Sequence, residues 1–191
     1  MSNKERMLQG MEFLTGDPEL MADKAKARCN ANEYNAISDE EADASERRVK
    51  KLKAMFGACG EKPFIKPPFR CDYGYRIFVG NNFFANFDCV FLDAGRIVFG
   101  DNCMVGPKTS ILAITHPLDP AERSKGIGIP KDVIIGNNVW LGANVTILPG
   151  VELGDNVVVG AGSVVTKSFP KNVVIAGNPA KIIRSIPEAT E

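Results

Sequence analysis

The sequence predicts a mainly β protein: a parallel β-helix built from six-residue repeats, preceded by a short N-terminal α-helical segment. Three observations support this prediction. An aliphatic residue returns every six positions, at Ile135, Leu141, Ile147, Leu153, Val159 and Val165. A glycine follows four of these residues, at Gly136, Gly142, Gly154 and Gly160. The first sixty residues instead carry apolar side chains at helical spacing.

The helical segment is expected over residues 1–60, packed on the β-helix. Two sets of apolar residues recur at intervals of three or four, which is typical of amphipathic helices: Met7, Met11 and Leu14, then Val49, Leu52 and Phe56. Ser38 is followed by three acidic residues, so it predicts the start of the second helix. Gly57 or Gly60 is expected to end it.

Residues 61–191 are expected to form the β-helix. A period of six fits a short strand plus a tight bend, with the aliphatic side chain inside and the glycine at a corner too crowded for a Cβ. Three such sides close one coil, and coils stack about 4.8 Å apart. Earlier coils keep the rhythm, with a shift of two residues near Ala94, at Val79, Ala85, Phe91, Phe99, Val105 and Ile111. The rhythm stops at 117–132, where prolines and glycines predict a protruding loop, and a short tail ends the chain.

Composition excludes several classes of protein. The 23 Lys and Arg residues balance 23 Asp and Glu residues, which argues against a general nucleic-acid binder. Apolar residues make up 45% of the 191-residue chain, too many for disorder, yet no apolar run approaches the roughly 20 residues that span a bilayer. The charged start MSNKERMLQGMEF lacks an export signal, so we expect a cytoplasmic protein without a membrane segment. Five widely spaced cysteines fit free thiols in a reducing compartment.

Four segments carry a family resemblance. They are the six-residue repeats of 133–166, CDYGYRIFVGNNFFANFDCVFLDAG, the ITHPLDP loop and the ending GNPAKIIRSI. Together they resemble the maltose and galactoside O-acetyltransferases of the hexapeptide-repeat superfamily, over nearly the whole chain. The resemblance implies a left-handed β-helix, a homotrimer with active sites at the subunit interfaces, acetyl-CoA as co-substrate and a small-molecule sugar as acceptor.

His116 is the single histidine of the chain and the expected general base. Acyl transfer to a hydroxyl needs a group that removes the proton, because a neutral alcohol is a poor nucleophile. An imidazole with an ordinary pKa of about 6.5 is largely neutral near pH 7 and can accept that proton. Pro117 restricts the backbone of the preceding residue, which helps to orient the ring. The alternative interpretation is a surface-loop histidine without a task.

A single histidine also argues against other chemistry. Metal-dependent members of this fold, the carbonic anhydrase type, need three histidines around the ion, so we expect no metal site. A covalent acyl-enzyme on a serine is unsupported, because the sequence has no GxSxG motif. We therefore expect direct transfer within a ternary complex.

The resemblance implies four residues on the acceptor side of the site. Asn86 matches the family asparagine near the reacting groups, where its amide would hold the acceptor or the acetyl group. Asp72 and Asp93 are expected to bind sugar hydroxyls. Asp17 resembles the acid that the helical segment offers to the sugar, although helix capping explains it almost equally well because a proline follows it.

The resemblance places the acyl donor along the repeats. The backbone N–H of Ala143 matches the family donor that stabilises the developing oxyanion. Trp140 would lie beside the acyl-donor end, with the covering of apolar surface as its alternative role. The remaining positions are expected to bind coenzyme A, its pantetheine arm at Ala161 and Thr166 and its phosphates at Lys167, Lys181 and Arg184. A solvated basic surface is the alternative for the last three.

Two classes of function are open at this point. The first is an acetyl-CoA-dependent sugar O-acetyltransferase, with an antibiotic-inactivating acetyltransferase of the same fold as a variant. The NNFFANFD segment favours the sugar branch. The second class is a non-catalytic β-helix scaffold that binds protein partners on its flat faces, because a fold alone does not establish a function.

Overall fold

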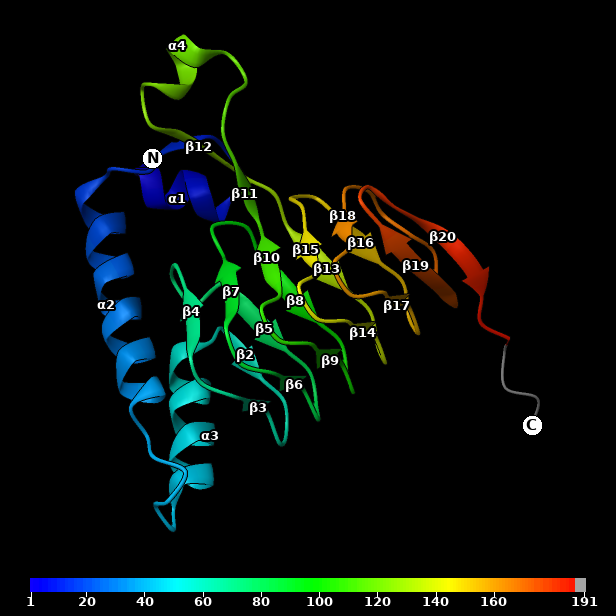
Figure 1. Ribbon diagram of the computed structural model, residues 1–191. Helices are drawn as coiled ribbons and strands as arrows, with labels where there is room; N and C mark the ends of the chain where they lie inside the picture. The colour runs from blue at the N-terminus through cyan, green and yellow to red at the C-terminus, as the bar shows by residue number, and fades with distance from the viewer. Residues whose placement is uncertain (188–191) are drawn as a thin grey trace.

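Coils of short parallel strands stack along one axis and form a three-sided prism (Figure 1). The computed structural model describes residues 1–187. The first face contains β2 (Ala58–Cys59), β5 (Ile77–Val79), β8 (Ile97–Phe99), β13 (Val133–Ile135) and β16 (Glu152–Leu153). The second face contains β3 (Phe64–Ile65), β6 (Phe84–Ala85), β9 (Met104–Val105), β14 (Trp140–Leu141), β17 (Val158–Val159), β19 (Val173–Gly177) and β20 (Ala180–Ser185). The third face contains β4 (Phe69–Cys71), β7 (Cys89–Leu92), β10 (Ser110–Leu112), β15 (Thr146–Ile147) and β18 (Val164–Val165).

The six-residue repeat places its aliphatic residues in the interior, as predicted. The residues at this repeat position are at most 3% exposed, at Ile135, Leu141, Ile147, Leu153, Val159 and Val165. A second position of each repeat is buried as well, at Val139, Val145, Val151, Val157 and Ser163. In the earlier coils the interior is filled by aromatic rings in contact, such as the Phe83 and Phe99 rings at 4.9 Å. Burial of these columns is the main stabilising contribution to the prism.

Side-chain caps close the corner between the first and second faces, which we call the capped corner: Asn81, Asp101, Asn137 and Asp155. The backbone N–H groups of the first three donate to a side-chain oxygen one coil later, from Asn81 to Asp101 at 2.7 Å, Asp101 to Asn137 at 2.8 Å and Asn137 to Asp155 at 2.6 Å. Gly136 is required beside these caps, because a Cβ there would collide with the Asp155 carboxylate. The adjacent asparagines form a second ladder with positive φ, at Asn82, Asn102, Asn138, Asn156 and Asn172.

The helical segment differs from its prediction at several points. It contains α1 (Asn3–Leu8), α2 (Pro18–Asn35) and α3 (Ala44–Met55). The expected apolar stripe over 7–14 is only partly helical, because Leu14 lies in the short strand β1 (Phe13–Leu14). The predicted start at Ser38 is wrong, since its hydroxyl accepts from Glu40 N in a separate turn and α3 begins at Ala44. Among residues 1–187, the helices are all too short or too polar to cross a membrane.

The long helix α2 lies across the N-terminal end of the prism, next to β4 (Figure 1). Its last residue, Asn35, pairs with both backbone groups of Phe69 in β4: Nδ2 donates to the carbonyl at 3.0 Å, and Oδ1 accepts the N–H at 2.9 Å. Buried Tyr34 donates its hydroxyl to the Ile65 carbonyl. The helix therefore satisfies backbone groups that the first coil would otherwise expose.

Residues 113–132 leave the prism between β10 and β13 as an arm, at the corner that we call the arm corner (Figure 1). The arm contains β11 (Ile114–Thr115), α4 (Pro120–Arg123) and β12 (Ile127–Pro130). Strand β12 pairs antiparallel with β11 on one side and with β1 on the other. The arm is thus joined to the N-terminal segment by a small three-stranded sheet.

Candidate active site

His116 lies on the arm directly after β11, and its side chain is exposed. Its Nδ1 atom is 2.8 Å from the backbone carbonyl oxygen of Ile127 in β12. A carbonyl oxygen only accepts hydrogen bonds, so Nδ1 carries the hydrogen in the neutral ring. The lone pair is then on Nε2, which is the atom that can remove a proton from a ligand.

Two carboxylates lie at the arm corner, each directly after a strand of the third face. Asp72 follows β4 and forms an ion pair with Lys24 at 3.4 Å, with about a quarter of its side chain exposed (24%). Asp93 follows β7 and is fully buried, with Oδ1 accepting from Asp72 N at 3.0 Å and Tyr73 N at 2.8 Å, and Oδ2 accepting from Arg76 N at 3.3 Å. Burial outweighs these bonds and raises the pKa of Asp93 to about 6. Asp93 therefore shapes the turn over 72–76 and is closed to solvent in the single chain, so its expected contact with a sugar hydroxyl stays a prediction.

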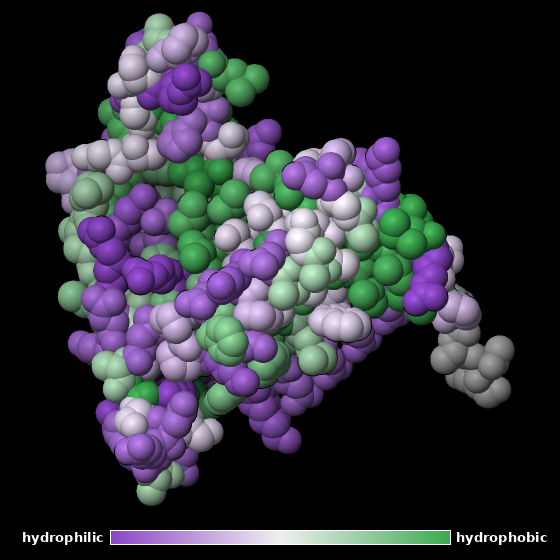
Figure 2. Space-filling model, in the orientation of Figure 1, coloured by the Kyte–Doolittle hydropathy of each residue, from purple (hydrophilic) through white to green (hydrophobic). Residues whose placement is uncertain are grey.

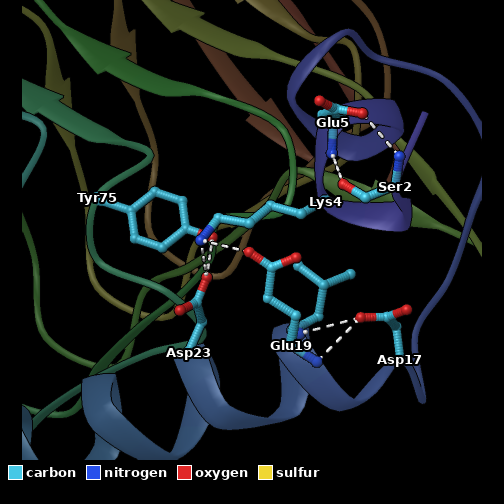
Figure 3. Close-up of polar contacts among 8 residues, drawn as sticks. Ser2, Lys4, Glu5, Asp17, Glu19, Asp23 and Tyr75 are labelled. Atoms are coloured by element: carbon cyan, nitrogen blue, oxygen red, sulfur yellow. Dashed lines mark hydrogen bonds and ion pairs between the residues drawn. The ribbon is translucent and has the colours of Figure 1, made fainter.

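Asp17 is the N-cap of α2, as the capping interpretation predicts (Figure 3). Its Oδ1 accepts from Glu19 N at 3.0 Å, and its Oδ2 accepts from the Asn3 amide at 2.9 Å. The Asn3 bond holds the pKa of Asp17 below its usual range. Nearby, Lys4 of α1 forms ion pairs with Asp23 and Glu19 of α2, at 2.8 and 3.2 Å. These contacts fix α1 against the start of α2.

A groove of about 420 Å³ runs along the second face and the corner between the second and third faces, which we call the open corner. It brings together four of the predicted site residues, Asn86, Trp140, Ala143 and Ala161. Its other walls are mostly apolar or glycine: Phe84, Met104, Val105, Gly106, Pro107, Gly142, Val158, Val159 and Gly160. Trp140 is 54% exposed, so it covers no interior of its own chain.

The open corner also presents unbonded donors. Within residues 1–187, the backbone N–H groups of Ala143 and Ala161 donate to no protein acceptor. The Asn86 side chain accepts from Phe87 N at 3.0 Å through Oδ1, which leaves its NH₂ group without a bond to a described residue. An apolar groove with a few fixed N–H donors suits a long, thin ligand that carries carbonyl oxygens.

The remaining predicted residues lie toward the C-terminal end of the prism. Thr166 and Lys167 follow β18 and are exposed, with the Lys167 ammonium 5.7 Å from the Phe169 ring centroid. Lys181 and Arg184 are exposed on β20. Figure 2 shows hydrophobic surface over this end as well, where β20 exposes Ile182 and Ile183. These cations are thus separate from the groove walls but on the same end of the molecule as Ala161.

The topology separates the predicted residues into two groups within one chain. One group lies at the arm corner: Asp72 and Asp93 follow strands of the third face, and His116 follows β11 of the arm. The other follows strands of the second face and lies at the open corner: Asn86, Ala143 and Ala161. No residue of the arm lines the groove. One chain alone therefore does not bring the expected base to the expected acyl-donor groove.

Sequence reasoning missed some groups at both corners. The Ile127 carbonyl that orients His116 has no side-chain signature. The groove walls Phe84, Met104 and Val158 had a usable signal, because each directly precedes an inward residue of its coil, as Trp140 does. Among the described residues there is no group of three His, Cys, Asp or Glu side chains that could hold a metal ion.

Comparisons with known proteins match the whole chain. The family model for the bacterial transferase hexapeptide (six repeats) matches residues 132–167, and the maltose acetyltransferase hexapeptide capping motif matches residues 6–60. The galactoside O-acetyltransferase of Escherichia coli is 37% identical over 95% of this chain and 88% of its own.

Solved structures agree with these matches. A maltose O-acetyltransferase from Clostridium difficile is 43% identical and superimposes with a TM-score of 0.94, covering 98% of this chain and 99% of that one. A hexapeptide-repeat acetyltransferase from Vibrio cholerae, complexed with acetyl coenzyme A, is 35% identical with a TM-score of 0.89, covering 98% and 100%. The predicted left-handed parallel β-helix is confirmed.

Proposed function

Since this chain belongs to the maltose and galactoside O-acetyltransferase family of hexapeptide-repeat acetyltransferases, we propose that it transfers the acetyl group of acetyl-CoA to a sugar hydroxyl. The observation that carries the proposal is the orientation of His116, whose Nδ1 is 2.8 Å from the Ile127 carbonyl. That contact reserves Nε2 for proton removal. The names of the relatives, galactoside and maltose acetyltransferases, support a sugar as acceptor.

The reaction is proposed to proceed by direct attack. His116 Nε2 takes the proton of the acceptor hydroxyl as its oxygen attacks the thioester carbonyl carbon. The Ala143 N–H donates to the oxyanion that forms. The C–S bond then breaks, and the proton on Nε2 passes to the departing thiolate of coenzyme A. The products are the acetylated sugar and free coenzyme A, with His116 neutral again.

The groove at the open corner is proposed to hold acetyl-CoA. Its apolar walls suit the pantetheine arm, and the Ala161 N–H is free to bond an amide oxygen of that arm. Trp140 would lie against the acyl end. Thr166 would bind farther along the arm, and the exposed cations Lys167, Lys181 and Arg184 would meet the phosphates.

The acceptor side is proposed to be built at the arm corner. Asp72, which is partly exposed, and Asp17, at the start of α2, would accept hydrogen bonds from sugar hydroxyls. Asn86, which lies at the open corner, would donate to the acceptor from the groove side through its unbonded NH₂ group. Asp93 would act indirectly, by holding the turn that presents Asp72.

The complete site is proposed to form between copies of the chain in a homotrimer. The base and the groove lie at different corners, so a second copy must present its open corner to the arm corner of the first. In a closed ring of three copies, every arm corner has such a neighbour. Exposed apolar side chains at both corners support this contact: Leu118 beside His116 is 93% exposed, and Met104 in the groove wall is 52% exposed.

A cytoplasmic location is also proposed. All five cysteines are free, including three that are buried, which fits a reducing compartment.

The test is acceptor-dependent release of coenzyme A, measured as free thiol, with maltose, glucose and galactosides as acceptors. His116→Ala should lower kcat by about 10²–10⁴-fold, because a general base contributes on that order. The fold should be unaffected, since the side chain is exposed. Lys125→Ala is the matched control in the same arm, because the Lys125 ammonium forms an exposed ion pair with Glu122 and has no other described partner within residues 1–187.

Equal rates for His116→Ala and the wild type would show that the base is assigned wrongly. Absence of acceptor-dependent release across the whole panel would contradict a sugar as the acceptor.

A further inference from the structure

The strand that holds the His116 imidazole, β12, pairs with two neighbouring strands. Strand β12 carries the Ile127 carbonyl and lies between β11, which leads to His116, and β1 of the N-terminal segment. In the register, Phe13 faces Gly128 and Leu14 faces Ile127. The position of the Ile127 carbonyl therefore depends on β1 as well as on the arm.

Thr15, which directly follows β1, forms two hydrogen bonds to the residue that precedes β12. Its backbone N–H and its hydroxyl both donate to the Gly126 carbonyl oxygen, each at 2.9 Å. Gly126 lies in a turn with a φ of +76° and immediately precedes Ile127. Two donors on one carbonyl fix the entry of the chain into β12 just before the carbonyl that orients His116.

The contact between β1 and β12 is also sterically close. A Cβ placed on Gly128 would lie 2.8 Å from the Thr15 γ-methyl carbon and 3.0 Å from the Phe13 ring. Phe13 itself is buried in a separate core cluster with Met7, Leu20, Tyr73 and Ala94. This cluster joins α1 and α2 to the turns of the prism, so β1 is a fixed edge against which β12 packs.

We propose that Thr15 is a positioning residue for His116. By holding the Gly126 carbonyl, it fixes β12, and the Ile127 carbonyl then keeps the His116 hydrogen on Nδ1 and the lone pair on Nε2. The N-terminal helical segment thereby takes part in acetyl transfer without contacting the reacting atoms. This inference rests on the proposed role of His116 as the base.

The test compares Thr15→Val with Thr15→Ser. Valine keeps the γ-methyl group and loses the hydroxyl bond, whereas serine keeps the hydroxyl. Thr15→Val should lower kcat by about 10-fold, because small misplacements of a reacting group are costly, and should leave the KM for acetyl-CoA unchanged. Thr15→Ser should stay close to the wild type. Gly128→Ala pushes β12 away from β1 and should act in the same direction as Thr15→Val.

A spectroscopic readout separates positioning from a general loss of structure. His116 is the single histidine, so ¹⁵N spectra of the imidazole report one ring. The wild type should show the Nδ1–H tautomer, and Thr15→Val should show a larger share of Nε2–H. An unchanged tautomer ratio, with or without a fall in kcat, would overturn the inference.

The inference and the proposed function fail in different ways. If His116→Ala keeps full activity, the base is wrong, yet the tautomer measurement still decides whether Thr15 positions the ring. If His116→Ala is inactive while Thr15→Val retains the wild-type kcat, the proposed function stands and the inference is wrong.

Discussion

The capped corner and the open corner have the same place in the repeat but opposite hydrogen-bonding states. At the capped corner, the residue after each glycine is Asn or Asp, and its oxygen accepts the N–H of the coil before it, as Asp155 does for Asn137. At the open corner, Ala143 and Ala161 occupy the matching positions after Gly142 and Gly160, and the Ala143 N–H is unbonded among the described residues.

Comparison of the two corners indicates that a repeat protein can convert a structural corner into a binding surface by the loss of one side-chain oxygen. Burial of the interior columns stabilises both corners, because the inward residues on either side are buried. What changes is whether the N–H is satisfied within the protein or left for a ligand. Three changes to the chain test this comparison.

The largest effect is expected when a cap is added to the open corner. Ala161 lies one coil after Ala143, as Asp155 lies one coil after Asn137. Ala161→Asn should therefore bring an amide oxygen within hydrogen-bond distance of the Ala143 N–H. Loss of one oxyanion donor should lower kcat by about 10²-fold or more. Thermal stability should rise slightly at the same time, since an unbonded N–H becomes satisfied.

The matched control is Ala161→Leu, which has nearly the shape of asparagine but no acceptor. It should raise the KM for acetyl-CoA by crowding the groove, with a smaller effect on kcat. If leucine and asparagine lower kcat equally, crowding explains the loss and the Ala143 N–H is not the oxyanion donor.

An intermediate effect is expected at the arm corner, where the cap is a buried carboxylate. Burial raises the pKa of Asp93 to about 6 from its ordinary value of 3.8. Between these pH values the folded chain therefore binds a proton that the unfolded chain has lost. The contribution of Asp93 to stability therefore falls as pH rises through this window, by an amount on the order of 3 kcal/mol.

Unfolding titrations of the wild type and Asp93→Asn should reveal this dependence as a difference between the two proteins. The stability advantage of the wild type should shrink between pH 4 and pH 7, because the asparagine variant does not ionise. A difference that stays constant, or grows with pH, would contradict the raised pKa.

The smallest effect is expected when a cap is removed from the capped corner. Asp155→Ala deprives the Asn137 N–H of its acceptor at 2.6 Å and should destabilise the protein by about 1 kcal/mol, because the group is partly open to water. Acetyl transfer should be unchanged. Urea denaturation and the thiol-release assay measure the two quantities, and a loss of activity here would remove the distinction between the corners.

The prism could be predicted from the sequence, because its period appears directly in residues such as Ile135, Leu141 and Ile147. The bounds of the helices in the N-terminal segment are harder to predict from the sequence. Helix α2 buries a face made of Leu20, Ala27, Ala31 and Tyr34, in which two alanines give little apolar contrast with their neighbours. The start of α3 was misplaced because Ser38 makes its cap-like bond within an isolated turn.

The sequence predicts the parts of the candidate site that depend on the type of side chain. It does not predict the contacts that depend on the path of the folded backbone. Asn86, Trp140, Ala143 and Ala161 do line one groove. Asp93 shows the limit, since only the path of residues 72–76 over it turns a plausible ligand-binding acid into a buried cap. The Ile127 carbonyl shows a second limit of prediction. Every residue has a backbone oxygen, and only the register of β12 brings that of Ile127 to His116.

The central claim is that the base and the acyl-donor groove of one site come from different copies of the chain. The most direct test co-expresses His116→Ala with Ala161→Asn under separate tags and measures acetyl transfer by mixed trimers. Each variant lacks a different half of the site, so random mixing at equal amounts should restore about one quarter of wild-type sites. Activity no higher than the mean of the two separate variants would place both halves in one chain and contradict the account.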